Sequence, residues 1–216
     1  MRSRDVQSRL KRRAAKANVY LPEPLADSLA AYYDLLFRWN RKINLTALDN
    51  PDTAIDRLLV EPLVAAKYLP PGAARLIDIG SGGGSPAIPF KLAIPALHLT
   101  MVEVKARKSA FLREAVRHLS LNGAEVETSR YEELLVRPEL HETSDVVSLR
   151  AVRTEARVLT SLQAFLKIGG TLMLFRGPSG PDVPPVVVPP LEWSATHPLL
   201  ESLQSRVTLM TKRRVG

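Results

Sequence analysis

The sequence predicts a doubly wound α/β fold, a mostly parallel β-sheet with helices on both faces. From residue 75 onward, short β-prone runs alternate with helical stretches, and this alternation is typical of parallel strands joined by right-handed crossovers. A glycine-rich run directly follows the first of those strands. The chain has 216 residues, 45% of them hydrophobic, and a chain of this length buries a core without disulfides. Ligands of such sheets bind at the carboxyl ends of the strands, where the strand order reverses.

Each element follows from its local pattern. Apolar residues recur every three or four positions over 25–40 and predict a helix, and Asp52 after Pro51 predicts the N-cap of a second helix over 52–68. After Gly72 the period changes. We expect strands at 75–79, 98–103, 125–128, 145–149 and 171–175, and helices at 86–93, 105–121 and 153–166.

Six prolines within residues 178–190 exclude a helix or a central strand there. Only enough chain for one more strand pair follows, so we interpret this segment as a stiff loop between two strands and not as a domain boundary. The predicted organisation is a basic N-terminal tail and helical extension over 1–70, followed by one compact domain over 71–216.

The formal net charge is +8, and residues 1–16 carry +6 of it. Such a cluster indicates attraction to a polyanion. A solvated tail is the plain alternative, and an Arg-rich start also resembles a transit peptide. Asp5 and a second basic cluster at 212–214 weaken the transit-peptide interpretation.

The composition excludes several classes of site. The chain has no cysteine, which excludes disulfides, thiolate zinc sites, iron–sulfur clusters and a cysteine nucleophile; we assign no metal. No apolar run reaches the roughly 18 residues of a membrane span, and the N-terminus lacks the apolar region of a secretory signal. We therefore expect a soluble, cytoplasmic protein without membrane partners.

The most informative motif is the run from Leu76 to Pro86, with four glycines among residues 80–84. Glycines at the end of a strand allow a sharp turn and close approach to a ligand, so the run predicts a nucleoside site. The dinucleotide fingerprint G-x-G-x-x-G fits poorly, because Ser85 stands in place of its third glycine. Asp78 would also repel a pyrophosphate, whereas it would favour a sulfonium or an ammonium group. The D-x-G-x-G arrangement resembles the S-adenosylmethionine loop of the class I methyltransferases.

Three further strand ends carry candidate ligand contacts. Glu103 ends the second strand, where a carboxylate accepts the hydroxyls of a ribose, of adenosylmethionine and NAD alike. Tyr131 and Glu132 follow the third strand, in the loop that lies beside the adenine ring in methyltransferase sheets. Arg150 ends the fourth strand and could bind a methionine carboxylate, a phosphate or a guanine edge.

The resemblance then becomes closer than fold class. The pattern W-N-x-x-x-N-L-T over 39–46, the loop over 78–89, Glu103 with Arg107-Lys108, and Ser148-x-Arg150-Ala151 occur in order. Together they resemble the bacterial glucose-inhibited division protein B family, small-subunit ribosomal RNA guanine-N7 methyltransferases, over about residues 20–177. The resemblance implies a seven-stranded sheet of the class I methyltransferase type and S-adenosyl-L-methionine as cofactor.

The residues and the resemblance together give two expected sets. The expected cofactor contacts are Asp78, Gly80, Gly82, Gly84, Ser85, Glu103, Tyr131, Glu132 and Arg150. The expected RNA contacts are Arg12, Arg13, Arg41, Lys42, Arg150, Arg153 and Arg176. The chain departs from the family at Ser85, where Leu or Phe is usual, at Ala87, at Glu61-Pro62, which replaces an Asp-Ser step, and at Arg176, where Lys is usual.

The acceptor chemistry narrows the reaction. Pyrimidine C5 methylation usually needs a cysteine, which is absent, and 148–151 is not the Asp/Asn-Pro-Pro-aromatic motif of exocyclic-amine methylases. Guanine N7 has an in-plane lone pair, so we assign no catalytic acid or base. The expected partner is structured small-subunit ribosomal RNA, alone or with ribosomal proteins, and we expect a monomer. Two alternatives stay open: an NAD-linked oxidoreductase, and a methylase-like protein that binds RNA without turnover.

Overall fold

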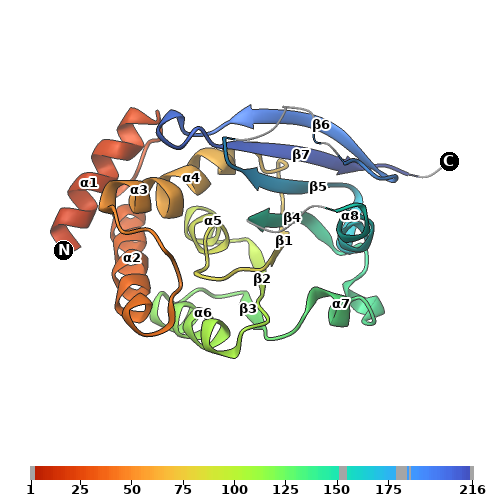
Figure 1. Cartoon of the computed structure of the whole chain (residues 1–216), viewed down its shortest axis with the longest axis horizontal. Helices are drawn as coiled ribbons and strands as arrows, with labels where there is room; N and C mark the ends of the chain where they lie inside the picture. The colour runs from red at the N-terminus through yellow and green to blue at the C-terminus, as the bar shows by residue number, and fades with distance from the viewer. Residues whose placement is uncertain (1–2, 151–154, 179–183, 185, 215–216) are drawn as a thin grey trace.

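The structure is a computed structural model that describes residues 3–150, 155–178, 184 and 186–214. A seven-stranded sheet forms its centre, with helices on both sides (Figure 1). The strands are β1 (Arg75–Ile79), β2 (His98–Val102), β3 (Ala124–Glu127), β4 (Ser144–Arg150), β5 (Leu166–Arg176), β6 (Leu191–Pro198) and β7 (Arg206–Lys212). The longer α-helices are α1 (Ser3–Lys16), α2 (Glu23–Ile43), α5 (Ala87–Ala93), α6 (Ala106–His118) and α8 (Ala156–Leu162), and the shorter ones are α3 (Pro51–Ile55), α4 (Glu61–Ala65) and α7 (Tyr131–Leu134).

The strand order β3-β2-β1-β4-β5-β7-β6 confirms the predicted doubly wound, mostly parallel sheet. Strands β1 to β5 pair in parallel, and β7 pairs antiparallel to both β5 and β6. Chain order reverses between β1 and β4, which are direct neighbours. The switch point, where ligands of such sheets bind, therefore lies beyond the ends of these two strands.

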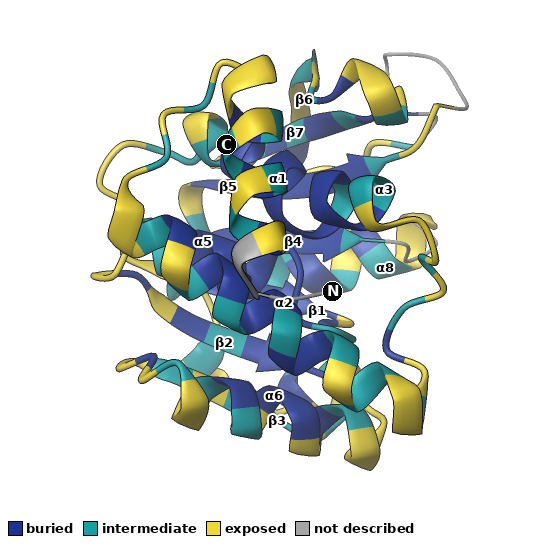
Figure 2. Ribbon diagram, turned by 90° about the vertical axis from the view of Figure 1, so that its left-hand side faces the viewer, coloured by how far each residue is buried: buried dark blue, intermediate teal, exposed yellow. Residues whose placement is uncertain are grey.

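Alternation along the strands divides the core between the two faces of the sheet. In β1, Leu76 joins a cluster with residues of α1 to α6, whereas Ile77 and Ile79 join a second cluster with residues of α7 and α8. This is the period of two expected of a strand buried on both faces. Figure 2 shows that the helices are buried on their inner sides and exposed on their outer sides.

The expectation of an N-terminal tail is wrong for α1, because these residues form a helix that packs on the body of the protein. Val6, Leu10 and Ala14 are fully buried, and Val6 and Leu10 belong to a core cluster that also holds residues of α2 and α3. They stand four positions apart, so they share one face of the helix. The many arginines around them obscured this stripe in the sequence. The division of the chain at residue 70 stays a prediction.

The predicted helix over 52–68 is four short helical pieces. It starts at α3, whose N-cap is Asn50 and not Asp52 as predicted: the Asn50 side chain accepts hydrogen bonds from the backbone of the next turn. A π-helical turn over Asp56–Val60 follows, then α4 and a 3₁₀ turn over Ala66–Tyr68. Periodicity cannot reveal the wide π turn, since the apolar spacing changes little over five residues.

The other predicted elements differ at their ends. β5 begins at Leu166, five residues before the predicted strand, and α8 covers only the middle of the predicted 153–166 helix. The start of that helix falls at residues 151–154, which lie outside the described residues, as does much of the proline-rich segment. Among the described residues, no helix is long and apolar enough to cross a membrane.

Candidate cofactor and RNA site

The glycine loop after β1 turns through backbone conformations that suit glycine alone. Gly80, Gly82 and Gly84 have φ angles of 73°, 53° and 86°, in the left-handed region that side chains disfavour. A Cβ atom on Gly84 would lie 2.5 Å from Cδ1 of Ile88. This loop needs its glycines for their φ angles and, at Gly84, for tight packing against α5.

The inner side of helix α2 supports the glycine loop. The Tyr32 hydroxyl donates to the carbonyl oxygen of Gly83, and a Cβ on Gly83 would approach the Leu36 side chain to 3.3 Å. Asn40 holds the turn after α2 with three hydrogen bonds, accepting from the amides of Leu45 and Thr46 at 2.6 and 2.8 Å and donating to the Thr46 carbonyl. The W-N-x-x-x-N-L-T pattern thus supplies the hydrogen bonds that fix this turn beside the glycine loop.

Asp78 is buried just before the loop, at the centre of the switch point. Its Oδ1 accepts a hydrogen bond of 2.6 Å from the hydroxyl of Ser148 on β4, the strand next to β1. Burial raises the pKa of Asp78, and the Ser148 hydrogen bond and the positive charge of Arg150 oppose that shift. A buried carboxylate of this kind gains from a cationic ligand, because such a ligand would stabilise its charged form.

Glu103 follows β2 and organises the loop from the other side. One carboxylate oxygen accepts from the Gly82 amide at 2.9 Å, and the other accepts from the Lys105 amide at 2.8 Å. A carboxylate offers about four lone-pair positions, so each oxygen retains one for a ligand hydroxyl. Glu103 is buried, so the fold fixes the direction of these remaining lone pairs.

Arg150 ends β4 and takes part in a buried ion pair. Its Nη1 lies 2.6 Å from Oε2 of Glu61, whose side chain is fully buried, and donates to the Arg57 carbonyl at 2.9 Å. The other Glu61 oxygen pairs with the Arg57 guanidinium at 2.8 Å. The guanidinium of Arg150 also stacks 4.5 Å above the ring of Phe175. Burial lowers the pKa of Arg150, and Glu61 opposes that shift.

The π turn explains how this pair is held. The Arg57 carbonyl accepts from Arg150, and the Leu58 carbonyl accepts from the Ser85 hydroxyl at 2.9 Å. The π turn thus directs backbone acceptors at both the end of β4 and the glycine loop. π turns occur often at functional sites. The hydroxyl hydrogen of Ser85 is already used in this bond, and the predicted cofactor contact of Ser85 stays a prediction.

Four buried side-chain atoms of the described residues lack a hydrogen-bond partner: Nε and Nη2 of Arg150, Oγ of Ser129, and Oε2 of Glu61, which is nevertheless ion-paired with Nη1 of Arg150. Buried polar atoms are normally satisfied, so such atoms call for an explanation. Arg150 ends β4 and Ser129 follows β3, both at the carboxyl edge of the sheet. With Asp78, Glu103 and the glycine loop along the same edge, this donor and acceptor set fits an adenosine with a cationic amino-acid tail.

The remaining predicted cofactor contacts, Tyr131 and Glu132, lie at the start of α7. This helix starts two residues after Ser129. Burial and the nearby Glu132 raise the pKa of the half-buried Tyr131. Tyr131 packs against the second core cluster, and Glu132 is exposed.

The residues predicted to contact RNA occupy different environments. Arg41 and Lys42 are exposed in the last turn of α2, and Arg12 is exposed on α1 with a distant contact to Asp52. Arg13 instead pairs with Asp52 and with the buried Asp56. Arg176 ends β5, where it donates to the Thr208 hydroxyl at 3.3 Å; Arg153 lies outside the described residues.

Sequence reasoning missed the residues that support the site. Glu61 appeared only as a departure from the family pattern, and Ser148 only as part of a motif. Glu61 stands 89 positions from Arg150 and Ser148 stands 70 from Asp78, so no local signal connects them. The one available local signal was Glu61 in a mostly apolar segment, four residues after Arg57, because a buried carboxylate requires a partner.

Known proteins are similar to this chain over most of its length. The profile of the family described as rRNA small subunit methyltransferase G matches residues 25–183. The ribosomal RNA small subunit methyltransferase G of Syntrophotalea carbinolica is 34% identical over 81% of this chain and 80% of its own length. The protein of the same name from Xylella fastidiosa is 38% identical over 79% of this chain and 78% of its own.

Solved structures with much lower identity share the fold. A SAM-dependent methyltransferase from Aquifex aeolicus superposes with a TM-score of 0.57 at 15% identity, covering 77% of this chain and 95% of that one. A mutant of the protein MtNAS in complex with S-adenosylmethionine superposes with a TM-score of 0.59 at 13% identity, covering 88% and 79%. These confirm the class I methyltransferase fold. By its sequence over most of its length, the chain belongs to the rRNA small subunit methyltransferase G family.

Proposed function

We propose that this protein transfers a methyl group from S-adenosylmethionine to N7 of a guanine in small-subunit ribosomal RNA. The observation that carries the proposal is the pair of buried Arg150 nitrogens, Nε and Nη2, that lack a hydrogen-bond partner, together with the buried carboxylate of Asp78, whose pKa burial raises and the charge of Arg150 lowers. Family membership supports ribosomal RNA as the substrate.

The residues divide the work of holding the cofactor. Glu103 would accept the ribose hydroxyls, and the loop beginning at Ser129 would border the adenine. The free donors of Arg150 would take the methionine carboxylate, and Asp78 would place negative charge near its cationic groups. When bound, S-adenosylmethionine supplies an electrophilic methyl group on a positively charged sulfur.

The acceptor makes no demand for a general base. Guanine N7 carries an in-plane lone pair, so no proton has to leave before the new N–C bond forms. The chain then contributes position and electrostatics, for which orientation alone can supply roughly 7–11 kcal/mol. The guanine becomes cationic as it is methylated, and the Asp78 carboxylate would stabilise that charge if the base lies near it.

The direct test is methyl transfer from labelled S-adenosylmethionine to three acceptors: small ribosomal subunits that lack the modification, their naked RNA, and free guanosine. We expect transfer to the ribosomal RNA and not to guanosine, with chain cleavage after reduction and aniline treatment at one guanine, as N7 methylation predicts. Label in a position that resists this cleavage would contradict the N7 assignment, and no label would contradict the activity.

A protein that uses ribosomal RNA would act in the cytoplasm. Whether ribosomal proteins contribute to recognition is answered by the ratio of transfer to subunits and to naked RNA. The dinucleotide alternative is disfavoured by the buried Asp78 carboxylate and by the family, and the absence of turnover would be seen directly as an unlabelled acceptor.

A further inference from the structure

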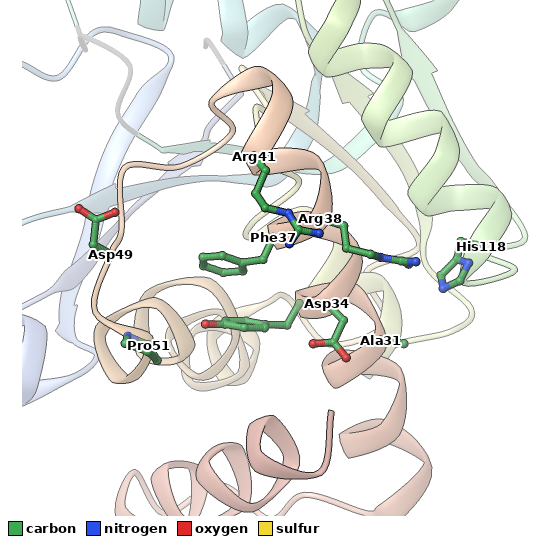
Figure 3. Close-up of a pocket in the computed structure, with 9 residues that line it drawn as sticks. Ala31, Asp34, Phe37, Arg38, Arg41, Asp49, Pro51 and His118 are labelled. Carbon is green, nitrogen blue, oxygen red and sulfur yellow. The ribbon is translucent and has the colours of Figure 1, made fainter. Parts of the chain in front are cut away.

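A surface hollow lies on the outer side of α2, and none of its lining residues belongs to the candidate cofactor site (Figure 3). It has a volume of about 730 Å³ between α2 and the turn that leads into α3. Arg41 projects from α2 over Phe37, Arg38 extends toward His118 of α6, and Asp49 and Pro51 stand on the opposite side. A second hollow of about 390 Å³ shares Arg38 and Arg41 and adds Lys42.

The cations of this hollow are available to a ligand. The structure records no hydrogen bond or ion pair from the side chains of Arg38, Arg41 or Lys42 to any described residue, and all three are exposed. Three basic side chains of α1 differ, because Arg9, Lys11 and Arg13 are engaged with carboxylates of the chain. Compared with these three side chains of α1, the cations on α2 are therefore freer to bind phosphate.

Aromatic rings lie beside these cations. Phe37 is half-buried and stacks on Tyr33 with ring centroids 4.4 Å apart. Aromatic rings that stack bases, next to cations that hold the backbone, are the combination by which proteins bind single-stranded nucleic acid. The carboxylates of Asp34 and Asp49, which also line the hollow, are suited to accept hydrogen bonds from exocyclic amines of a base.

The hollow is one helix away from the cofactor loop. Tyr32 and Leu36, on the inner side of α2, contact Gly83, while Phe37 and Arg38, on its outer side, line the hollow. An α-helix with its side chains is about 10–12 Å across. The glycine loop and the hollow therefore lie on opposite sides of one helix, separated by about its width.

We infer that this hollow, defined by Phe37, Arg38, Arg41 and Asp49, binds an unpaired nucleotide of the RNA substrate that neighbours the target guanine. The base contacts Phe37, and the flanking phosphates contact Arg38 and Arg41. The inference rests on the proposed RNA substrate and adds a second contact outside the cofactor pocket. It gives the enzyme a means of selecting unpaired RNA.

The test measures binding of a short oligocytidylate, through the fluorescence of Trp39 beside the hollow, as a function of salt. Arg38→Glu and Arg41→Glu should each weaken binding and lower the salt slope by about 0.7, the contribution of one phosphate on a single strand. Phe37→Leu should weaken binding roughly ten-fold with little change in slope, and Phe37→Tyr should restore it.

Arg75→Glu is the matched control, since it makes the same charge change at an exposed position at the start of β1, on the opposite edge of the sheet. S-adenosylhomocysteine affinity and the unfolding midpoint should stay unchanged in the arginine variants. Equal behaviour of Arg38→Glu, Arg41→Glu and Arg75→Glu would overturn the inference. So would losses confined to protein-containing subunits, because these would assign the hollow to a ribosomal protein.

These failures differ from failure of the proposed function. If the unmodified enzyme methylates no RNA, the function is wrong, and the oligocytidylate measurement still decides whether the hollow binds RNA. If the enzyme methylates RNA and the hollow variants bind the oligonucleotide as Arg75→Glu does, only the inference is wrong.

Discussion

Replacing Glu61 with glutamine removes the charge at the centre of the buried cluster while nearly preserving its shape. Glu61 is fully buried, with Arg150 at 2.6 Å and Arg57 at 2.8 Å. Without its carboxylate, two arginines would face each other at a site where Arg150 is largely shielded from water. Breaking a buried pair from one side costs about 3–5 kcal/mol. For a chain of this size that corresponds to a fall in melting temperature of roughly 6–20 °C.

Urea unfolding at neutral pH measures this cost, with Glu114→Gln as the matched control. Glu114 also pairs with an arginine at 2.8 Å, but that partner, Arg117, is 76% exposed, so we expect a loss below about 1 kcal/mol. S-adenosylhomocysteine should also bind more weakly to Glu61→Gln, because Arg150 loses the group that orients it. Equal stability losses in the two variants would refute the reasoning that the cluster depends on a buried charge.

Three further predictions concern the loop and α1. Burial raises the pKa of Asp78, so the charged carboxylate destabilises the fold above that pKa, and Asp78→Asn should raise the free energy of unfolding at neutral pH. The same substitution should weaken binding of S-adenosylmethionine. In the unmodified protein we expect this affinity to fall as the pH falls, and Asp78→Asn should abolish that pH dependence. Gly84→Ala should cost more stability than Gly72→Ala by about 1–3 kcal/mol, since both have positive φ but only Gly84 lacks room for a Cβ; equal unfolding midpoints would contradict this. Arg13→Ala should lower the melting temperature well below that of Arg12→Ala, because Arg13 alone pairs with a buried aspartate, and calorimetric scans of the two would show no difference if that pair contributed nothing.

The sequence allowed the sheet and the position of the site to be predicted because both depend on local signals. Alternating strand and helix patterns predict the parallel sheet, and glycines after a strand mark the ligand edge whatever the rest of the chain does. Asp78 and Glu103 were identified by their place at strand ends, and the structure puts both at the glycine loop.

The parts that could not be predicted depend on contacts between distant residues. Nothing near Glu61 in the sequence shows that it faces Arg150, since the two meet only when the π turn lies over the end of β4. The helix α1 was missed for a different reason. Its stripe of Val6, Leu10 and Ala14 has the correct spacing, but seven basic residues around it suggested a solvated tail. Weighting that spacing above the composition would have found the helix.

Calorimetric titration of the purified protein with S-adenosylhomocysteine and, separately, with NADH examines the pocket itself. We predict one S-adenosylhomocysteine site per chain, strongly weakened by Arg150→Met, and no heat from NADH. Binding of NADH in place of S-adenosylhomocysteine, or S-adenosylhomocysteine affinity unaltered by Arg150→Met, would contradict the assignment of this pocket.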